Sequence, residues 1–175
     1  EDLTDPRWRD QLVMADPRFG TTGGHFAALS SWYDRQGTPE AYQSLQEGLS
    51  TNGIRLLPGG NAAVVDLVDR GEATLGLTDA DDVRAANRRG SDLVMYPLGP
   101  TDSVGTFVMP NTVARLAGST LPGATRLMDY LLSDEVARAL AESTSGNLPL
   151  SPEVAADYPE LMIGTPMSAD FQHIA

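Results

Sequence analysis

The feature that most constrains the fold is a unit that occurs three times in the first half of the chain. Each unit has a short apolar run, a loop of glycine or small polar residues, and a segment with helical spacing of apolar residues. The apolar runs are residues 11–15, 54–57 and 74–78. Alternation of strands with helices predicts an α/β fold with a mostly parallel sheet and flanking helices.

Further apolar runs extend this pattern toward the middle of the chain. Leu93–Tyr96 is predicted to be a fourth strand, and Gly105–Met109 has strand-like composition up to Pro110. Between them the polar sequence GPTDS at 99–103 predicts a boundary between two lobes. We therefore expect a central ligand-binding lobe over residues 1–100, and a largely helical return segment over 101–175.

Charge and residue types exclude several function classes. A formal net charge of -12 disfavours nucleic acid and anionic membrane surfaces as partners, because like charges would meet over a broad face. All 12 basic residues are arginine and there is no cysteine. Mechanisms that need a Schiff-base lysine, a phosphate-loop lysine or a thiolate are therefore excluded.

Two glycine-containing loops that follow strands are candidate ligand sites. Thr21, Thr22 and Gly23 precede a predicted helix, whose N-terminus suits an oxyanion, although a capped helix with a flexible turn would look the same. Asn61 follows Gly59 and Gly60, and its amide either caps its own helix or faces a ligand. Because ligands bind outside the carboxyl ends of parallel strands, we expect these loops to converge with the one after Thr78.

The third loop carries Asp79, Asp81 and Asp82 directly after the strand. Carboxylates at a strand end could bind Mg²⁺ or Ca²⁺, and a metal-dependent phosphohydrolase using Asp79 and Asp81 is the alternative function. Metal-dependent phosphohydrolysis of this type also requires a lysine, and this chain has none. Asp81 and Asp82 equally suit the start of a helix, where carboxylates meet the positive end of the helix dipole.

At this point several motifs resemble one known family. The segments DLTDPRW, ADPRFGTTGGHFAAL, PGGNAAVVDLVDRGEATLGLTDADD, GTFVMPNTVA and LMDYLLSDEVARALAESTSGNLPL resemble the iron(III)-type extracellular solute-binding proteins of ABC transporters. The resemblance implies a periplasmic-binding-protein fold of the second type, in which two lobes close over a ligand. Members of the family are longer on the N-terminal side. The resemblance therefore also implies that this chain is a fragment that lacks the first part of the other lobe.

Ligand residues follow from the resemblance position by position. The loop Thr21-Thr22-Gly23 resembles the family's anion-binding loop, Asn61 resembles its asparagine, and Thr78 with Asp79 takes the strand-end position. Where ferric-binding members have adjacent tyrosines, this sequence has Asp79 and Ala80. Asp79 could coordinate a hard cation such as Fe³⁺ with its synergistic anion, or it could face an amine or hydroxyl of an organic solute.

The resemblance further implies the biological setting. It predicts a binding protein without enzymatic activity that delivers its solute to an ABC permease. The location would be periplasmic or extracellular, with membrane association in a Gram-positive host. If part of a lobe is absent, the apolar faces of Phe107–Met109 and Leu127–Leu131 lose partners, which predicts a homodimer of the truncated chain.

Overall fold

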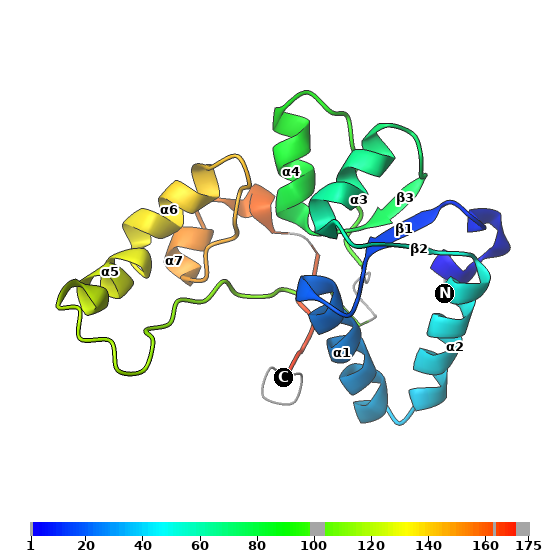
Figure 1. The fold of residues 1–175 in the computed structure, drawn as a ribbon, viewed down its shortest axis with the longest axis horizontal. Coiled ribbons are helices and arrows are strands. Elements are labelled where there is room, and N and C mark those ends of the chain that lie inside the picture. The colour runs from blue at the N-terminus through cyan, green and yellow to red at the C-terminus, as the bar shows by residue number, and fades with distance from the viewer. Residues whose placement is uncertain (1, 99–103, 163, 171–175) are drawn as a thin grey trace.

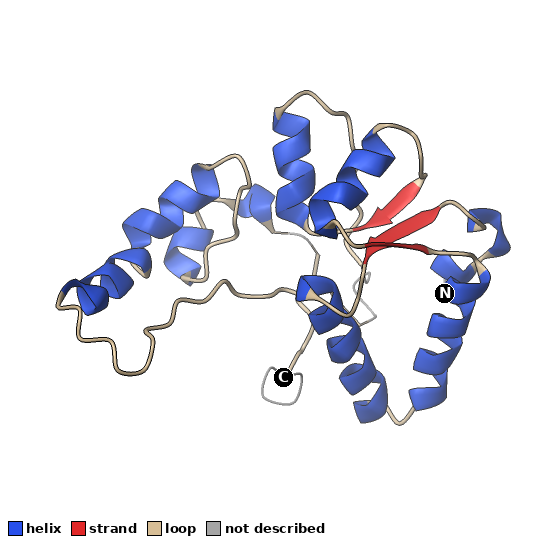
Figure 2. Ribbon diagram, in the orientation of Figure 1, coloured by secondary structure: helices blue, strands red, loops and turns tan. Residues whose placement is uncertain are grey.

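The computed structural model describes residues 2–98, 104–162 and 164–170, and the first part of the chain contains a three-stranded parallel sheet (Figure 2). The strands are β1 (Leu12–Ala15), β2 (Arg55–Leu57) and β3 (Leu75–Leu77), in the spatial order β2-β1-β3. Val13 pairs with Arg55 on one side and with Gly76 on the other. The predicted parallel α/β architecture is thereby confirmed, with β1 in the middle.

Helices connect the strands and lie on both sides of the sheet (Figure 1). Between β1 and β2 the chain forms a hairpin of two helices, α1 (Gly20–Arg35) and α2 (Pro39–Thr51). On the other side, α3 (Gly60–Asp69) connects β2 to β3, and α4 (Ala80–Arg88) follows β3. Two short 3-10 helices, Asp2–Thr4 and Pro6–Trp8, precede β1.

The main core is the contact between β1 and α3. Val13 of β1 and Val64 of α3 are both fully buried in this contact. Leu57, Leu67 and Val68 pack against this core from β2 and α3. A second cluster of Val65, Val83 and Ala86 joins α3 to α4. Burial of these aliphatic side chains fixes the positions of the two helices whose first turns border the carboxyl edge of the sheet.

Gly76 of β3 lets α3 approach the sheet closely. A Cβ atom at this position would lie 2.6 Å from Cγ1 of Val64 and 3.0 Å from Cγ2 of Val68. Both distances are at or below the limit of real carbon–carbon contacts. The glycine in the sequence LGLTDADD is therefore a packing requirement of the sheet that carries the aspartates.

The second part of the described chain is mainly helical. It contains α5 (Gly123–Leu131), α6 (Asp134–Glu142), α7 (Pro152–Ala155) and a 3-10 turn at Pro159–Leu161. These helices extend away from the sheet at the left of Figure 1. Ser133 caps α6, because its hydroxyl accepts from the N–H of Val136. None of the helices in the described ranges has the length and apolar character needed to cross a membrane.

Two predicted strands are wrong. Leu93–Tyr96 forms no strand, because both backbone groups of Leu93 bond to the side chain of Asn87, with Leu93 N donating at 2.9 Å and Asn87 Nδ2 donating at 2.8 Å. Of Gly105–Met109, only Thr106 forms a bridge, with Pro166. The predicted boundary at residues 99–103 lies outside the described residues, so the division into lobes at 100 stays a prediction.

Arginines join the second part to the helices of the first. Arg84 of α4 donates through Nη1 to the carbonyl of Gly146 at 2.8 Å and through Nη2 to that of Leu161 at 2.9 Å. Arg35 of α1 donates to the carbonyl of Ser168 at 2.6 Å. Met167 is buried against Ala28 and Leu29 of α1. By contrast, α5 has no buried residue, and Leu127 is 57% exposed.

The close approach at Gly76 predicts a packing defect on enlargement. The variant G76A should lower the free energy of unfolding by about 1–3 kcal/mol, because overpacking displaces Val64 and Val68. Chemical denaturation measures the change. G123A is the matched control, because a Cβ there meets nothing within 4 Å, and it should change stability by less than about 0.5 kcal/mol. A G76A variant as stable as G123A would contradict the packing role, and in a V64A background the effect of G76A should shrink.

Candidate functional site

Three helix starts meet at the carboxyl edge of the sheet. Thr21 and Thr22 lie in the first turn of α1, Asn61 lies in the first turn of α3, and Asp79 is the residue just before α4. They border a pocket of about 300 Å³. Its lining residues are Ala15, Asp16, Phe19, Gly20, Thr21, Thr22, Leu57, Pro58, Gly60, Asn61 and Asp79. Because residues of all three loops line this one pocket, the predicted convergence of the loops is confirmed.

A compact hydrogen-bond network links the three loops across the sheet edge. The Thr21 hydroxyl donates to Oδ2 of Asp79 at 2.8 Å, and Nδ2 of Asn61 donates to the same oxygen at 2.6 Å. Asn61 Nδ2 also lies 2.8 Å from Oγ1 of Thr21. The Thr22 hydroxyl makes a longer contact of 3.5 Å with Oδ1 of Asn61. One carboxylate oxygen therefore organises side chains from three separate loops.

Asn61 and Asp79 both forgo the helix-capping role that their types favour. The cap of α3 is Gly59 rather than Asn61, and the amide of Asn61 serves the network instead. Asp79 occupies the cap position of α4 but makes no side-chain capping bond. Asn61 is further fixed through its carbonyl, which accepts from the Thr78 hydroxyl at 3.2 Å. The sequence-based alternative that Asn61 caps its own helix is therefore wrong.

Gly23 has a structural rather than a polar role in the described site. A Cβ atom there would lie 2.5 Å from the carbonyl oxygen of Pro17. The missing side chain lets the first turn of α1 pack against the chain that leaves β1. Gly23 thus positions Thr21 and Thr22, and it is not among the residues that line the pocket.

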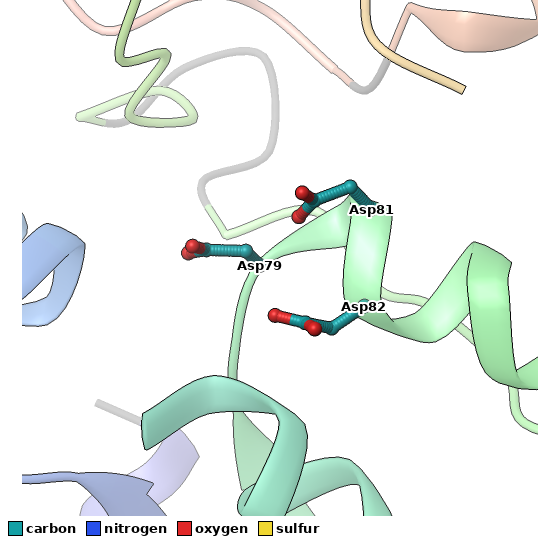
Figure 3. Close-up of side chains that lie close together, drawn as sticks. All are labelled: Asp79, Asp81 and Asp82. Carbon is teal, nitrogen blue, oxygen red and sulfur yellow. The ribbon is translucent and has the colours of Figure 1, made fainter. Parts of the chain in front are cut away.

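The three aspartates of the third loop form an acidic cluster (Figure 3). Asp81 and Asp82 lie in the first turn of α4, as expected for carboxylates near the positive end of a helix dipole. One oxygen from each of Asp79, Asp81 and Asp82 lies within 4.8 Å of the others. Carboxylates this close are a donor set that a hard cation could use, and they also repel one another.

Burial and repulsion set the protonation of this cluster. Burial raises the pKa of Asp79, and the negative charge of Asp81 raises it further, while the hydrogen bonds from Thr21 and Asn61 act in the opposite direction. Burial likewise raises the pKa of Asp82, with Asp81 and Asp79 adding to the effect. Desolvation and repulsion therefore both disfavour the charged form of these carboxylates, as is common at functional sites.

Asp16, Arg18 and Phe19 were not predicted as part of the site. Arg18 donates to both carboxylate oxygens of Asp16, at 3.0 Å from Nε and 2.5 Å from Nη2, and this pairing lowers the pKa of Asp16 to about 2. The Arg18 guanidinium lies 5.7 Å from the ring centre of Phe19, which is 69% exposed at the pocket. The sequence feature that could have identified them is their position directly after β1, at the edge where the other loops meet.

His25 lies in α1 close to the loop but does not line the pocket. Its ring stacks on Phe107 at 5.5 Å between centres, and burial lowers its pKa. A Cβ atom on the neighbouring Gly24 would lie 2.6 Å from Cε of Met109. The segment around residue 107 therefore covers the first turns of α1. It packs against this helix and is not left without partners there.

Comparison with known proteins identifies a family and a relative. Residues 1–167 match the family described as bacterial extracellular solute-binding protein. The chain is also 30% identical over 142 residues to an uncharacterized protein of Haemophilus influenzae, a match that covers 77% of this chain and 37% of that relative. No solved structure gives a significant match.

The burial of Asp79 predicts a pH-dependent gain in stability for D79N. Because its pKa lies above the ordinary value of 3.8, the folded state binds the proton more tightly than the unfolded chain. Stability contributed by this group therefore falls as the pH rises above 3.8 through the folded pKa. D79N should be more stable than the wild type at neutral pH, and this advantage should vanish at about pH 3. Urea unfolding at both pH values measures it.

The control for this effect is D66N, at an exposed position of α3. It should change stability by less than about 0.5 kcal/mol at either pH. A D79N variant less stable than the wild type at neutral pH would show instead that the hydrogen bonds to charged Asp79 outweigh its desolvation.

Proposed function

Because the chain belongs to the bacterial extracellular solute-binding protein family, we propose that it is the solute-binding component of an ABC importer. It binds a small solute in the pocket bordered by Thr21, Asn61 and Asp79. The solute is iron(III), iron(III) with a synergistic anion, or another solute that bears an oxyanion. The observation that supports this most is the convergence of three loops from adjacent parallel strands on one pocket.

Each loop contributes a different kind of contact. The first turns of α1 and α3 direct hydroxyl, amide and backbone N–H groups toward the solute, and the N-terminal ends of helices favour negative charge. Asp79 offers a carboxylate to a metal ion or to a hydrogen-bond donor. The exposed ring of Phe19 and the side chains of Leu57 and Pro58 give the pocket an apolar border beside these polar groups.

Transport follows from closure over the bound solute. The lobe of residues 1–100 holds the pocket, and the segment from 101 onward belongs to a second lobe that closes over it. A solute that contacts both lobes stabilises the closed form by its differential affinity, and the closed form is what a permease recognises. The protein acts in the periplasm or outside the cell, and the partner ATPase supplies the energy for transport.

A solute panel tests this function by thermal unfolding. Ferric nitrilotriacetate, inorganic phosphate and putrescine represent a metal complex, an oxyanion and an organic cation. A true solute at 100 times its Kd should stabilise the folded state by about 2.7 kcal/mol, which raises Tm by roughly 5–10 °C for a chain of this size. N61A should lose the shift, and Q46A on the exposed face of α2 should keep it.

Hydrolysis of p-nitrophenyl phosphate is measured in parallel. The proposed function predicts no turnover with any divalent metal added. Turnover that disappears in D79N would favour the phosphohydrolase alternative. A protein that none of the three solute classes stabilises, when tested at millimolar concentration, would contradict binding at this pocket.

A further inference from the structure

The side chain of Asp79 occupies the position that a solute oxyanion would take. An aspartate just before a helix ordinarily accepts from the N–H groups of the first turn, yet Asp79 makes no such bond. Its Oδ2 instead accepts from the Thr21 hydroxyl at 2.8 Å and from Asn61 Nδ2 at 2.6 Å. These two donors stand at the first turns of α1 and α3, where an incoming anion would bind.

The donor groups of Thr21 and Asn61 are already engaged in hydrogen bonds, so few remain for a free anion. Nδ2 of Asn61 also contacts Oγ1 of Thr21 at 2.8 Å, so the three side chains form a closed set. Oδ1 of Asn61 is directed toward the Thr22 hydroxyl at 3.5 Å. A solute oxyanion could reach these donors only by displacing the Asp79 carboxylate, which would leave a partly buried charge without partners.

The charges around the pocket act in the same direction. Among the described lining residues there is no arginine, lysine or histidine, and the nearby guanidinium of Arg18 is held by Asp16. Oxygens of Asp81 and Asp82 lie within 4.8 Å of an oxygen of Asp79. A free oxyanion would therefore meet repulsion from these carboxylates, and it would find no cation among the described lining residues.

We propose that Asp79 is a built-in anion that closes the oxyanion position of the pocket, so that the solute presents a positive charge to Asp79 and binds without an added anion. This inference rests on the proposed function. Of the solutes proposed there it keeps a metal ion without a synergistic anion, and it adds organic ammonium compounds. Asp79 would then determine specificity: its Oδ2 accepts from Thr21 and Asn61, and its other oxygen, Oδ1, would contact the cation.

Removal of the carboxylate should convert the pocket into an anion site. In D79A the donors of Thr21 and Asn61 lose their acceptor, and inorganic phosphate or formate should occupy the vacated position. Calorimetric titration should give a phosphate affinity on the order of tenfold or more above that of the wild type. D81A is the matched control: it removes one charge from the same cluster and leaves the Asp79 network in place, so its phosphate affinity should rise far less than that of D79A.

Two results would overturn the inference. One is phosphate binding to the wild type as tight as to D79A, and the other is a folded D79A that gains no affinity for either anion. D79S provides a second variant should D79A not fold, because its shorter side chain also vacates the position of Oδ2. Putrescine and ferric nitrilotriacetate, titrated into the wild type without phosphate, distinguish an ammonium solute from a metal ion.

The inference and the proposed function fail in different ways. Phosphate bound at the wild-type pocket would retain solute binding and refute the built-in anion. Gain of phosphate binding in D79A, with none of the three solute classes bound by the wild type, would support the built-in anion and contradict solute binding at this pocket.

Discussion

The architecture of the site depends on one acceptor, Oδ2 of Asp79. The Thr21 hydroxyl and the Asn61 amide both donate to it, and they come from loops that are 58 and 18 residues away in sequence. Without a shared acceptor, each of these loops would simply lead into a helix with an ordinary cap. With it, the first turns of α1 and α3 are fixed relative to the start of α4. The position of the pocket is therefore set by a polar contact at the edge of the sheet as well as by the apolar core.

The core brings the loops within reach of that acceptor. Because β1 lies between β2 and β3, the three strands deliver their loops to one edge in the order needed for contact. Gly76 allows α3 to pack closely on β3, so Asn61 and Asp79 stand at hydrogen-bonding distance. Burial in this arrangement raises the pKa of Asp79. The packing that builds the site thus also creates the unfavourable environment of its carboxylate, as is common where function requires a buried charge.

Much of this could be predicted from the sequence, for definite physical reasons. Short apolar runs followed by loops of glycine or small polar residues indicated β1, β2 and β3. The rule for open α/β sheets then brought Thr21, Asn61 and Asp79 together. The sequence did not reveal that Asn87 binds the backbone of Leu93 and prevents a fourth strand, because side-chain competition of this kind leaves no periodic signal. Nor did it show that Asp79 accepts hydrogen bonds from the groups that were expected to bind a solute, because that depends on distances between separate loops.

A crystal structure of the wild-type protein grown with phosphate and putrescine would test the built-in anion most directly. We expect Oδ2 of Asp79 to lie within hydrogen-bonding distance of Thr21 Oγ1 and Asn61 Nδ2, with no phosphate between them. The ammonium group or a metal ion should lie on the other side of the carboxylate. A phosphate held by Thr21 and Asn61, with Asp79 turned away, would contradict it.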